Sequence, residues 1–328
     1  SIRHDLARRD FTINTLAVQL NPRAFGRLVD FYGGQRDLKD QTIRVLHQLS
    51  IVEDPTRAFR AIRFELRLGF RLSEDVRVLI EGAAKMELFN RLSGERLLNE
   101  IRRLFAEPRS PHAIRRLAEL DLLRFIHPAL VWSSRLERRL SAVEAALDWY
   151  RRSEQDHLIT QWLVYVMVLA EILTTRAIRE MLDRLPFTEA DRSAIIESRW
   201  TASAVSRQLS PRSRRPSEVA RLLAGLSDET LVLLWSRSKP AIVKRQVAAY
   251  MTMYRTVRPV LTGKDLKALR LSPGPLYGKI LTRLMEARLD GEVTNEAEER
   301  DLVKHMVKKH RTVKEKSAYR SQSCRIDR

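Results

Sequence analysis

The sequence predicts a mainly α-helical fold, with β structure confined to about the first 50 residues. Gly and Pro are scarce, at 11 and 12 in 328 residues, whereas the helix-favouring Leu, Arg, Ala and Glu abound. Hydrophobic residues make up 44% of the chain and charged residues 31%, which is typical of a folded protein and not of a disordered one. The length exceeds one ordinary hydrophobic core, so several domains are expected.

Short apolar runs predict the strands of the N-terminal region. Residues 28–31 and 43–46 are two such runs on either side of Gly33-Gly34, where a turn is expected. A third run, residues 16–20, fits the end of a helix as well as the start of a strand, and the pattern leaves this open.

From Asp54 onward the pattern is helical almost throughout. Asp54 is predicted to cap a helix whose first residue is Pro55, and Gly69 to end it. Apolar residues recur between them at helical spacing. Further helices are predicted to start at Ser73 and Ser93, Ser217 is predicted to cap another, and the last compact unit is predicted to begin at Thr262.

Two basic segments mark boundaries in the second half of the chain. Residues 206–216 contain four Arg, three Ser and two Pro, which predicts a linker. Residues 304–328 contain nine Lys and Arg against two Asp and Glu, a net charge of +7. Such a run is typical of a solvated, flexible C-terminus.

The net charge of +19 favours a polyanionic partner. It comes from 60 Lys and Arg against 41 Asp and Glu, and Arg outnumbers Lys over most of the chain. Because Arg binds phosphate bidentately, nucleic acid is expected rather than a membrane surface. A codon preference for Arg would give the same composition.

Disulfide frameworks, Cys-based zinc sites and membrane spans are not predicted. Cys324 is the one cysteine, so neither a disulfide nor a Cys-based zinc site can form within one chain. The longest apolar run, residues 162–173, is too short to cross a membrane and contains Glu171. With no signal-peptide pattern at its start, the sequence predicts a cytoplasmic protein without a membrane partner.

Arg8-Arg9-Asp10 forms the first candidate site. Two adjacent guanidinium groups offer several N–H donors each beside one carboxylate. Arginine suits phosphate oxygens and a carboxylate accepts from ribose hydroxyls, so this group suits a nucleoside triphosphate. A plain helix start, with Asp10 as N-cap, explains the same three residues taken alone.

Asp54, Arg57, Arg60 and Arg63 form the second candidate site. They recur every third residue and so share one polar face of the predicted helix. Three arginines on one face repel each other unless an anion neutralises them, as a nucleoside triphosphate or RNA would. The alternative is a solvated face with ion pairs one turn apart.

An Asp–Arg pair can also distinguish bases by their edges. The carboxylate accepts from an exocyclic amino group and the guanidinium donates to a ring nitrogen, which matches cytosine and adenine. Guanine and uracil present a carbonyl and a ring N–H instead, and leave both partners unpaired. One such pair would therefore accept C and A and reject G and U.

The order of these motifs resembles the class II tRNA nucleotidyltransferase and bacterial poly(A) polymerase family. The resemblance begins with Arg-Arg-Asp-Phe-Thr-Ile-Asn at residues 8–14 and Glu-Asp-Pro-Thr-Arg at residues 53–57. Further segments match the family's hinge, template helix, supporting motif and tail in order: residues 30–45, 64–70, 91–100 and, more loosely, 262–291.

The resemblance implies an enzyme that adds A, or C and A, to the 3′ end of tRNA. ATP, or CTP where C is added, would be the nucleotide substrate, Mg²⁺ the cofactor, and the tRNA acceptor arm the partner. The residues that it assigns to nucleotide binding are Arg8, Arg9, Asp10, Asp54, Arg57, Arg60 and Arg63. Asp54 with Arg57 would be the base template, and Asn14 and Glu53 would support their neighbours.

The resemblance also implies a division into five segments. They are the end of the catalytic head at 1–50, a neck with the template at 51–130, a helical body at 131–210, a tRNA-binding tail at 211–303 and a basic C-terminus at 304–328.

The family's catalytic carboxylates are not found in this sequence. In the family, a Gly-Gly-x-Val-Arg-Asp loop and an Asp-x-Asp pair precede Arg-Arg-Asp and hold two metal ions. Neither motif occurs in residues 1–328. We therefore expect no catalytic or metal-ligating residue here, Mg²⁺ bound through carboxylates upstream, and no activity from this chain alone.

Three alternatives stay open at the level of sequence. A poly(A) polymerase shares the front motifs, although the tail motif favours tRNA. A non-catalytic helical RNA-binding module would keep the scaffold without the chemistry. A basic scaffold without any nucleotide site is the third.

Overall fold

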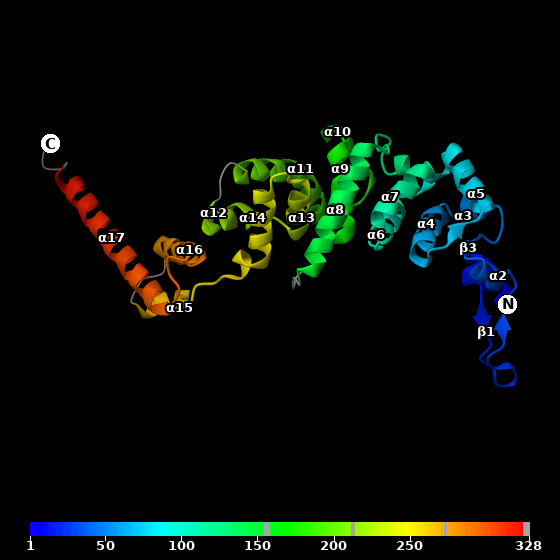
Figure 1. Cartoon of the computed structure of the whole chain (residues 1–328), viewed down its shortest axis with the longest axis horizontal. Helices are drawn as coiled ribbons and strands as arrows, with labels where there is room; N and C mark the ends of the chain where they lie inside the picture. Colours follow the sequence, from blue (N-terminus) through cyan, green and yellow to red (C-terminus); the bar gives the residue numbers. More distant parts are fainter. Residues whose placement is uncertain (154–157, 211–213, 270, 272–273, 324–328) are drawn as a thin grey trace. The chain divides into compact units, whose positions relative to one another are not determined.

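Among the described residues, the protein is mainly helical and its strands lie within residues 1–72, which confirms the predicted fold class (Figure 1). The last short strand, at residues 71–72, lies beyond the first 50 residues to which β structure was expected to be confined. The structure, a computed structural model, describes residues 1–328 apart from 154–157, 211–213, 270, 272–273 and 324–328. Contacts divide the chain into two compact units. The first comprises residues 1–204 and 227–237, and the second comprises residues 205–226 and 238–328.

The first unit begins with short helices and strands. They are α1 (Ile2–Ala7), η1 (Thr12–Asn14), β1 (Ala17–Val18), η2 (Pro22–Ala24), β2 (Leu28–Val29), α2 (Gly34–Lys39) and β3 (Thr42–Ile43). β1 pairs antiparallel with β2, and β3 pairs in parallel with β4 (Arg71–Leu72). The run at residues 16–20, which fits helix or strand, therefore contributes a strand.

Gly33 and Gly34 start a helix, and the turn predicted there is wrong. Helix α2 separates β2 from β3, which do not pair with each other. Gly33 has φ 77°, and the Asp30 carboxylate accepts from the backbone N–H of Gly34 (2.9 Å) and Gln35 (3.0 Å), which caps the helix. A Cβ on Gly34 would lie 2.5 Å from the carbonyl oxygen of Thr12, so only glycine fits this approach.

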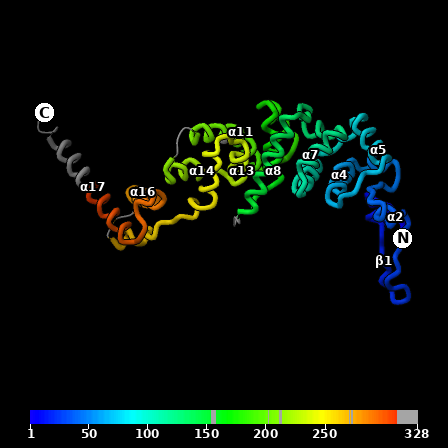
Figure 2. Tube along the Cα trace, viewed as in Figure 1, coloured from blue at the N-terminus to red at the C-terminus, as the bar shows by residue number. Residues whose placement is uncertain are grey.

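The rest of the first unit consists mainly of helices. They are α3 (Ser50–Glu53), α4 (Thr56–Leu68), α5 (Glu74–Lys85), η3 (Leu88–Arg91), α6 (Gly94–Phe105), α7 (Ser110–Glu119), η4 (Leu123–Phe125), α8 (Ser134–Arg152), α9 (Gln161–Ile172), α10 (Thr175–Arg184) and α13 (Asp228–Arg237). Helix α11 (Glu189–Leu209) passes from the first unit into the second. Although α13 comes late in the sequence, it packs against α8 and α9 (Figure 2).

Helix α4 has the two faces that the sequence predicts. It begins at Thr56, one residue after the predicted start, and ends at Gly69, which adopts φ 69° as expected. Phe59 and Ile62 on the apolar face are fully buried, and the helix packs against α6 and α7. This packing leaves the polar face for the residues of the second candidate site.

The helix starts predicted at Ser73 and Ser93 are confirmed, whereas the cap predicted at Ser217 is wrong. The hydroxyls of Ser73 and Ser93 accept from backbone N–H groups at the starts of α5 and α6, and Thr262 forms a capping box with Asp265. Ser217 is the exception, because it lies inside a helix and donates its hydroxyl to Asp290 at 2.7 Å.

The regular secondary structure of the second unit consists of helices over its described residues. Its helices are α12 (Pro216–Leu223), α14 (Ala241–Thr252), η5 (Tyr254–Thr256), α15 (Gly263–Ala268), α16 (Pro275–Leu289) and α17 (Glu296–Ser323). Their core includes Leu261, Leu266, Ile280, Leu284 and Val303.

Two segments predicted to be irregular are partly helical. Helix α11 extends to Leu209, into the segment predicted as a linker, of which residues 211–213 lie outside the described part. Helix α17 runs to Ser323, through most of the predicted flexible tail, while Cys324 and the residues after it are not described. The Lys- and Arg-rich composition favours helix, and an ion pair from Arg300 to Glu296 supports its first turns.

Gly94 fixes the approach of α6 to the C-terminal end of α10, and alanine there is expected to destabilise the fold. A Cβ would lie 2.0 Å from the carbonyl oxygen of Arg184, so Gly94→Ala should cost about 2 kcal/mol despite the better helix propensity of alanine. Gly82→Ala in α5 is the matched control, because a Cβ there meets no atom within 4 Å. It should stabilise by roughly 0.5–1 kcal/mol. Urea unfolding checks both, and a loss of stability of equal size in the two variants would contradict the packing argument.

Candidate nucleotide-binding site

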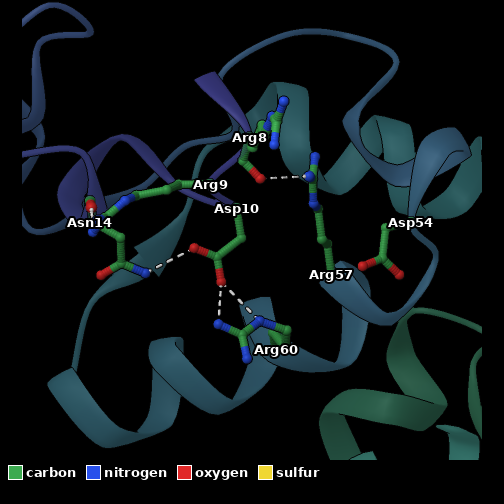
Figure 3. Close-up of a pocket in the computed structure, with 7 residues that line it drawn as sticks. All are labelled: Arg8, Arg9, Asp10, Asn14, Asp54, Arg57 and Arg60. Atoms are coloured by element: carbon green, nitrogen blue, oxygen red, sulfur yellow. Dashed lines mark hydrogen bonds and ion pairs between the residues drawn. The ribbon is translucent and has the colours of Figure 1, made fainter. Parts of the chain in front are cut away.

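Seven polar side chains surround a hollow of about 440 Å³ in the first unit (Figure 3). They are Arg8, Arg9, Asp10, Asn14, Asp54, Arg57 and Arg60. Residues 8–14 and the start of α4 supply them, so the two candidate sites of the sequence form one site in space.

Asp10 connects the N-terminal segment to α4. Its Oδ2 accepts from Arg60 Nε at 2.7 Å and also from Arg60 Nη2, while its Oδ1 accepts from Asn14 Nδ2 at 2.9 Å and from the backbone N–H of Phe11 at 3.0 Å. The residue is only 8% exposed. Both oxygens are thus engaged within the protein, and Asp10 holds Arg60 and Asn14 in place around the hollow.

The pKa of Asp10 lies below its ordinary value. Burial alone would raise this pKa, but hydrogen bonds from Asn14 and Arg60 and the positive charge of Arg60 outweigh the effect of burial. A carboxyl group with a lowered pKa stabilises the folded state above its unfolded pKa. That contribution is lost as the pH falls through the lower, folded pKa.

Asp10→Asn should therefore change how stability depends on acid. We expect the unaltered chain to be more stable than the variant at neutral pH, and the difference to shrink as the pH falls from about 5 to about 2. Urea unfolding at a series of pH values measures this. A difference between the two proteins that is independent of pH would contradict the role given to the ionised carboxylate.

Asp54 has one oxygen held and one oxygen available. Its Oδ1 accepts from the backbone N–H of Thr56 (3.0 Å), the hydroxyl of Thr56 (2.6 Å) and Nη2 of Arg96 (2.8 Å). Its Oδ2 has no hydrogen bond to a described residue, and the side chain is 32% exposed. The carboxylate is thus fixed in orientation while one acceptor remains at the hollow.

Arg57 is anchored by neutral oxygens. Its Nη1 donates to Oγ of Ser50 at 2.6 Å, and its Nη2 donates to the carbonyl oxygen of Arg8 at 3.1 Å (Figure 3). Its Nε has no partner among the described residues. No described carboxylate cancels the charge of Arg57, which therefore remains available to a bound group.

Arg8 and Arg9 supply exposed positive charge. Arg9 donates to the carbonyl oxygen of Asn14 at 2.8 Å and lies 3.7 Å from Asp5, in a largely exposed pair that contributes little. The guanidinium of Arg8 has no partner among the described residues.

Arg63 and Glu53 do not line the hollow. Arg63 is 14% exposed and lies 3.9 Å from the buried Glu100, and Glu53 lies 3.5 Å from His47. Protein carboxylates thus pair with Arg60 and Arg63, so the prediction that the arginine face needs an external anion is wrong for these two residues. The sequence pattern predicted that these arginines share one face of the helix, but not that Asp10 and Glu100 from other parts of the chain pair with them.

Arg96 and Ser50 contact the site and were not among the predicted site residues. Arg96 lies within residues 91–100, the segment whose resemblance implies support for the template helix, so that resemblance is a signal for it. Ser50 carries no comparable signal.

A metal centre is not formed by the described residues. Among them, no group of three or more His, Cys, Asp or Glu side chains is placed to hold a metal ion. Across the same residues, no helix is both long and apolar enough to cross a membrane.

Two family models match parts of the chain. The one described as the poly A polymerase head domain matches residues 1–44, and the one described as a probable RNA and SrmB-binding site of polymerase A matches residues 69–132. The first match covers the segment that supplies Arg8 to Asn14, but neither covers the start of α4.

Characterised relatives match over nearly the whole chain. The A-adding tRNA nucleotidyltransferase of Geobacter sulfurreducens is 41% identical over 304 residues, which cover 91% of this chain and 34% of that protein. The chain therefore spans about a third of the length of this relative.

Solved structures share the fold. The Thermotoga maritima CCA-adding enzyme complexed with tRNA matches with a TM-score of 0.76 and 29% identity, covering 94% of this chain and 74% of that one. A CCA-adding enzyme in complex with ATP matches with a TM-score of 0.74 and 30% identity, covering 92% and 71%. With these matches and the ordered motifs, the chain belongs to the class II tRNA nucleotidyltransferase family, which contains A-adding and CCA-adding enzymes.

Proposed function

We propose that this chain is the nucleotide-selecting and RNA-binding part of an enzyme that adds A, or C and A, to the 3′ end of tRNA. The observation that carries the proposal is the gathering of Asp54 and Arg57 with Arg8, Arg9 and Arg60 around one hollow. A relative named for A addition and similar structures with tRNA and with ATP support this choice of substrates.

Asp54 and Arg57 are assigned to the base. Oδ2 of Asp54 would accept from the exocyclic amino group of adenine or cytosine, and the guanidinium of Arg57 would donate to the neighbouring ring nitrogen. With guanine or uracil a carbonyl would face the carboxylate and a ring N–H would face the guanidinium. Two unpaired polar groups then oppose binding, which is the source of selection.

The arginines at the exposed side of the hollow are assigned to the triphosphate. Arg8 and Arg9 are free of close ion pairs with described carboxylates apart from the long contact of Arg9 to Asp5, so their charge is available to phosphate oxygens. Arg60 is already neutralised by Asp10 and would contribute a directed N–H group. Asp10 would act mainly by orienting Arg60 and Asn14, since its own oxygens are occupied.

Transfer of the nucleotide is assigned to groups that the described residues do not provide. Mg²⁺ bound by paired carboxylates would stabilise charge on the α-phosphate and activate the 3′-hydroxyl. No such carboxylate cluster exists among the described residues, and the family's two metal-binding motifs do not occur in residues 1–328. The proposal is that this chain alone selects a nucleotide without joining it to RNA.

Incorporation by the protein at its full natural length tests the function. Transcripts of tRNA that end before, within and after the CCA sequence would each be incubated with Mg²⁺ and one nucleotide. Addition of A to tRNA ending in CC is expected, with C added as well if the enzyme is CCA-adding. A long A tract on RNA that is not tRNA would favour a poly(A) polymerase, and no extension of any RNA would contradict the proposal.

Arg96→Ala should weaken base selection through Asp54. Arg96 on helix α6 is one of three donors to Oδ1 of Asp54, beside the N–H and the hydroxyl of Thr56, so its loss would hold the carboxylate less firmly. We expect the preference for ATP over GTP to fall about threefold, as loss of a half-exposed ion pair contributes on the order of 0.6 kcal/mol. Arg103→Ala on the same helix is the control, because Arg103 pairs with Glu100 and not with the site. Equal effects of the two variants on the ATP to GTP binding ratio would contradict the positioning role.

A further inference from the structure

The second unit contains a hollow of about 570 Å³, and none of its lining residues belongs to the nucleotide site. Helix α12 contributes Ala220 and its C-cap residue Ala224 to one wall, and α16 contributes Leu281, Met285 and Leu289 to the other. Each set recurs at intervals of four residues and so lies on one helix face. Small side chains opposite longer ones leave a slot with apolar walls, which we call the α12–α16 slot.

Polar groups border the α12–α16 slot. Arg221 lies 3.6 Å from Glu286, and this ion pair joins the two walls. Tyr254 and Arg258 follow α14, and Arg258 Nη1 donates to the carbonyl oxygens of Arg255 (2.7 Å) and Val257 (2.8 Å). Those carbonyl oxygens orient the guanidinium of Arg258 without cancelling its charge.

The unit that holds the slot carries most of the charge of the chain. Residues 205–226 and 238–328 contain 26 Lys and Arg against 11 Asp and Glu, a net charge of +15 out of the +19 of the whole sequence. The first unit is nearly balanced by comparison. A polyanionic partner is therefore expected mainly at the second unit.

We propose that the α12–α16 slot takes one unstacked nucleotide of an RNA loop. Its volume falls within the roughly 300–1,000 Å³ of small-ligand sites. Apolar walls with Tyr254 suit the faces of a base, and Arg258, whose guanidinium is held by carbonyl oxygens only, suits a phosphate beside that base. The net charge of +15 on the second unit as a whole favours a polyanion over a mononucleotide or an apolar ligand. The inference rests on the proposed function for the identity of the partner as RNA.

Ala220→Leu tests the slot by filling it without changing any charge. Fluorescence anisotropy would compare binding to an RNA hairpin with an unpaired loop and to a blunt RNA duplex of equal length. We expect the variant to bind the hairpin about tenfold more weakly, because stacking of a single base contributes on that scale, and to bind the duplex as before. A 2-aminopurine in the loop should change its emission on binding to the unaltered chain and not on binding to the variant.

Two further variants make the test decisive. Ala241→Leu at the start of α14 is the control, because it adds the same side chain in the same unit outside the slot. Ala224→Leu replaces Ala220→Leu if the latter unfolds on thermal melting. Equal hairpin affinity in slot and control variants would overturn the proposal, as would AMP binding with RNA-like affinity.

The slot and the proposed function can fail separately. Selection among nucleoside triphosphates, measured in Ala220→Leu, should be unchanged. If Asp54→Ala loses selection while the slot variants keep full RNA affinity, only the slot inference is wrong. If the slot variants lose affinity for looped RNA while Asp54→Ala keeps selection, only the template is wrong.

Discussion

Replacing Asp54 with alanine is expected to remove most of the preference for ATP and CTP over GTP and UTP. In the proposed template, Oδ2 of Asp54 is the acceptor that meets an exocyclic amino group, because both oxygens of Asp10, the other carboxylate at the hollow, already accept hydrogen bonds. GTP and UTP would leave the carboxylate of Asp54 without a hydrogen-bond donor, which weakens their binding. Removing that carboxylate should therefore change the affinity ratio between ATP or CTP and GTP or UTP by at least about tenfold. Competition binding of the four nucleotides to the chain measures it, and RNA affinity should be almost unaffected.

Two substitutions sharpen this prediction. Asp54→Asn offers both an acceptor and a donor, so it should admit GTP and UTP instead of merely weakening ATP. Glu53→Ala is the matched control, since that neighbouring carboxylate faces His47 and does not line the hollow. An equal loss of selection in Glu53→Ala and Asp54→Ala would contradict the assignment of Asp54 to the base.

Arg60→Ala is expected to destabilise the first unit strongly. It would leave the carboxylate of Asp10, which is 8% exposed, without its ion partner. Removal of one partner from a buried ion pair costs about 3 kcal/mol or more. By contrast, Arg77→Ala breaks exposed pairs with Glu74 and Glu81 on α5 and should change stability far less, because solvent screens such pairs. Urea unfolding compares the two.

The double variant Arg60→Ala/Asp10→Asn separates the loss of the ion-pair attraction from the cost of leaving the buried carboxylate of Asp10 charged and unpaired. If Arg60→Ala is harmful because Asp10 is left ionised and buried, adding Asp10→Asn should recover part of the stability. Stability that falls further in the double variant would show that Arg60 contributes by packing alone, and would contradict the account of the ion pair.

Local sequence was enough to predict the fold class, and together with the family resemblance it predicted most of the residues that line the site. Helix periodicity places Arg57 and Arg60 on one face, and residues 8–14 carry their own chemical signature. The start of α4 could be predicted to within one residue, because Asp54 and Pro55 are characteristic of a helix N-terminus.

Long-range pairs could not be predicted from local pattern. Asp10 meets Arg60 because residues 8–14 lie against α4, and Asp54 meets Arg96 because α4 packs against α6. Periodicity showed that Arg63 shares a face with Arg57, but not that Glu100 of another helix lies beside it. For the same reason Gly33 and Gly34 look like a turn in sequence. The helix that they start depends on Asp30, whose carboxylate binds its first N–H groups.

Equilibrium binding of ATP, CTP, GTP and UTP to the chain, without RNA, tests the central claim most directly. The claim is that Asp54 and Arg57 select the nucleotide before any chemistry occurs. Isothermal titration should show ATP and CTP binding at least about tenfold more tightly than GTP and UTP, with the difference lost in Asp54→Ala. Equal affinity for all four nucleotides, or a preference that survives in Asp54→Ala, would contradict the account.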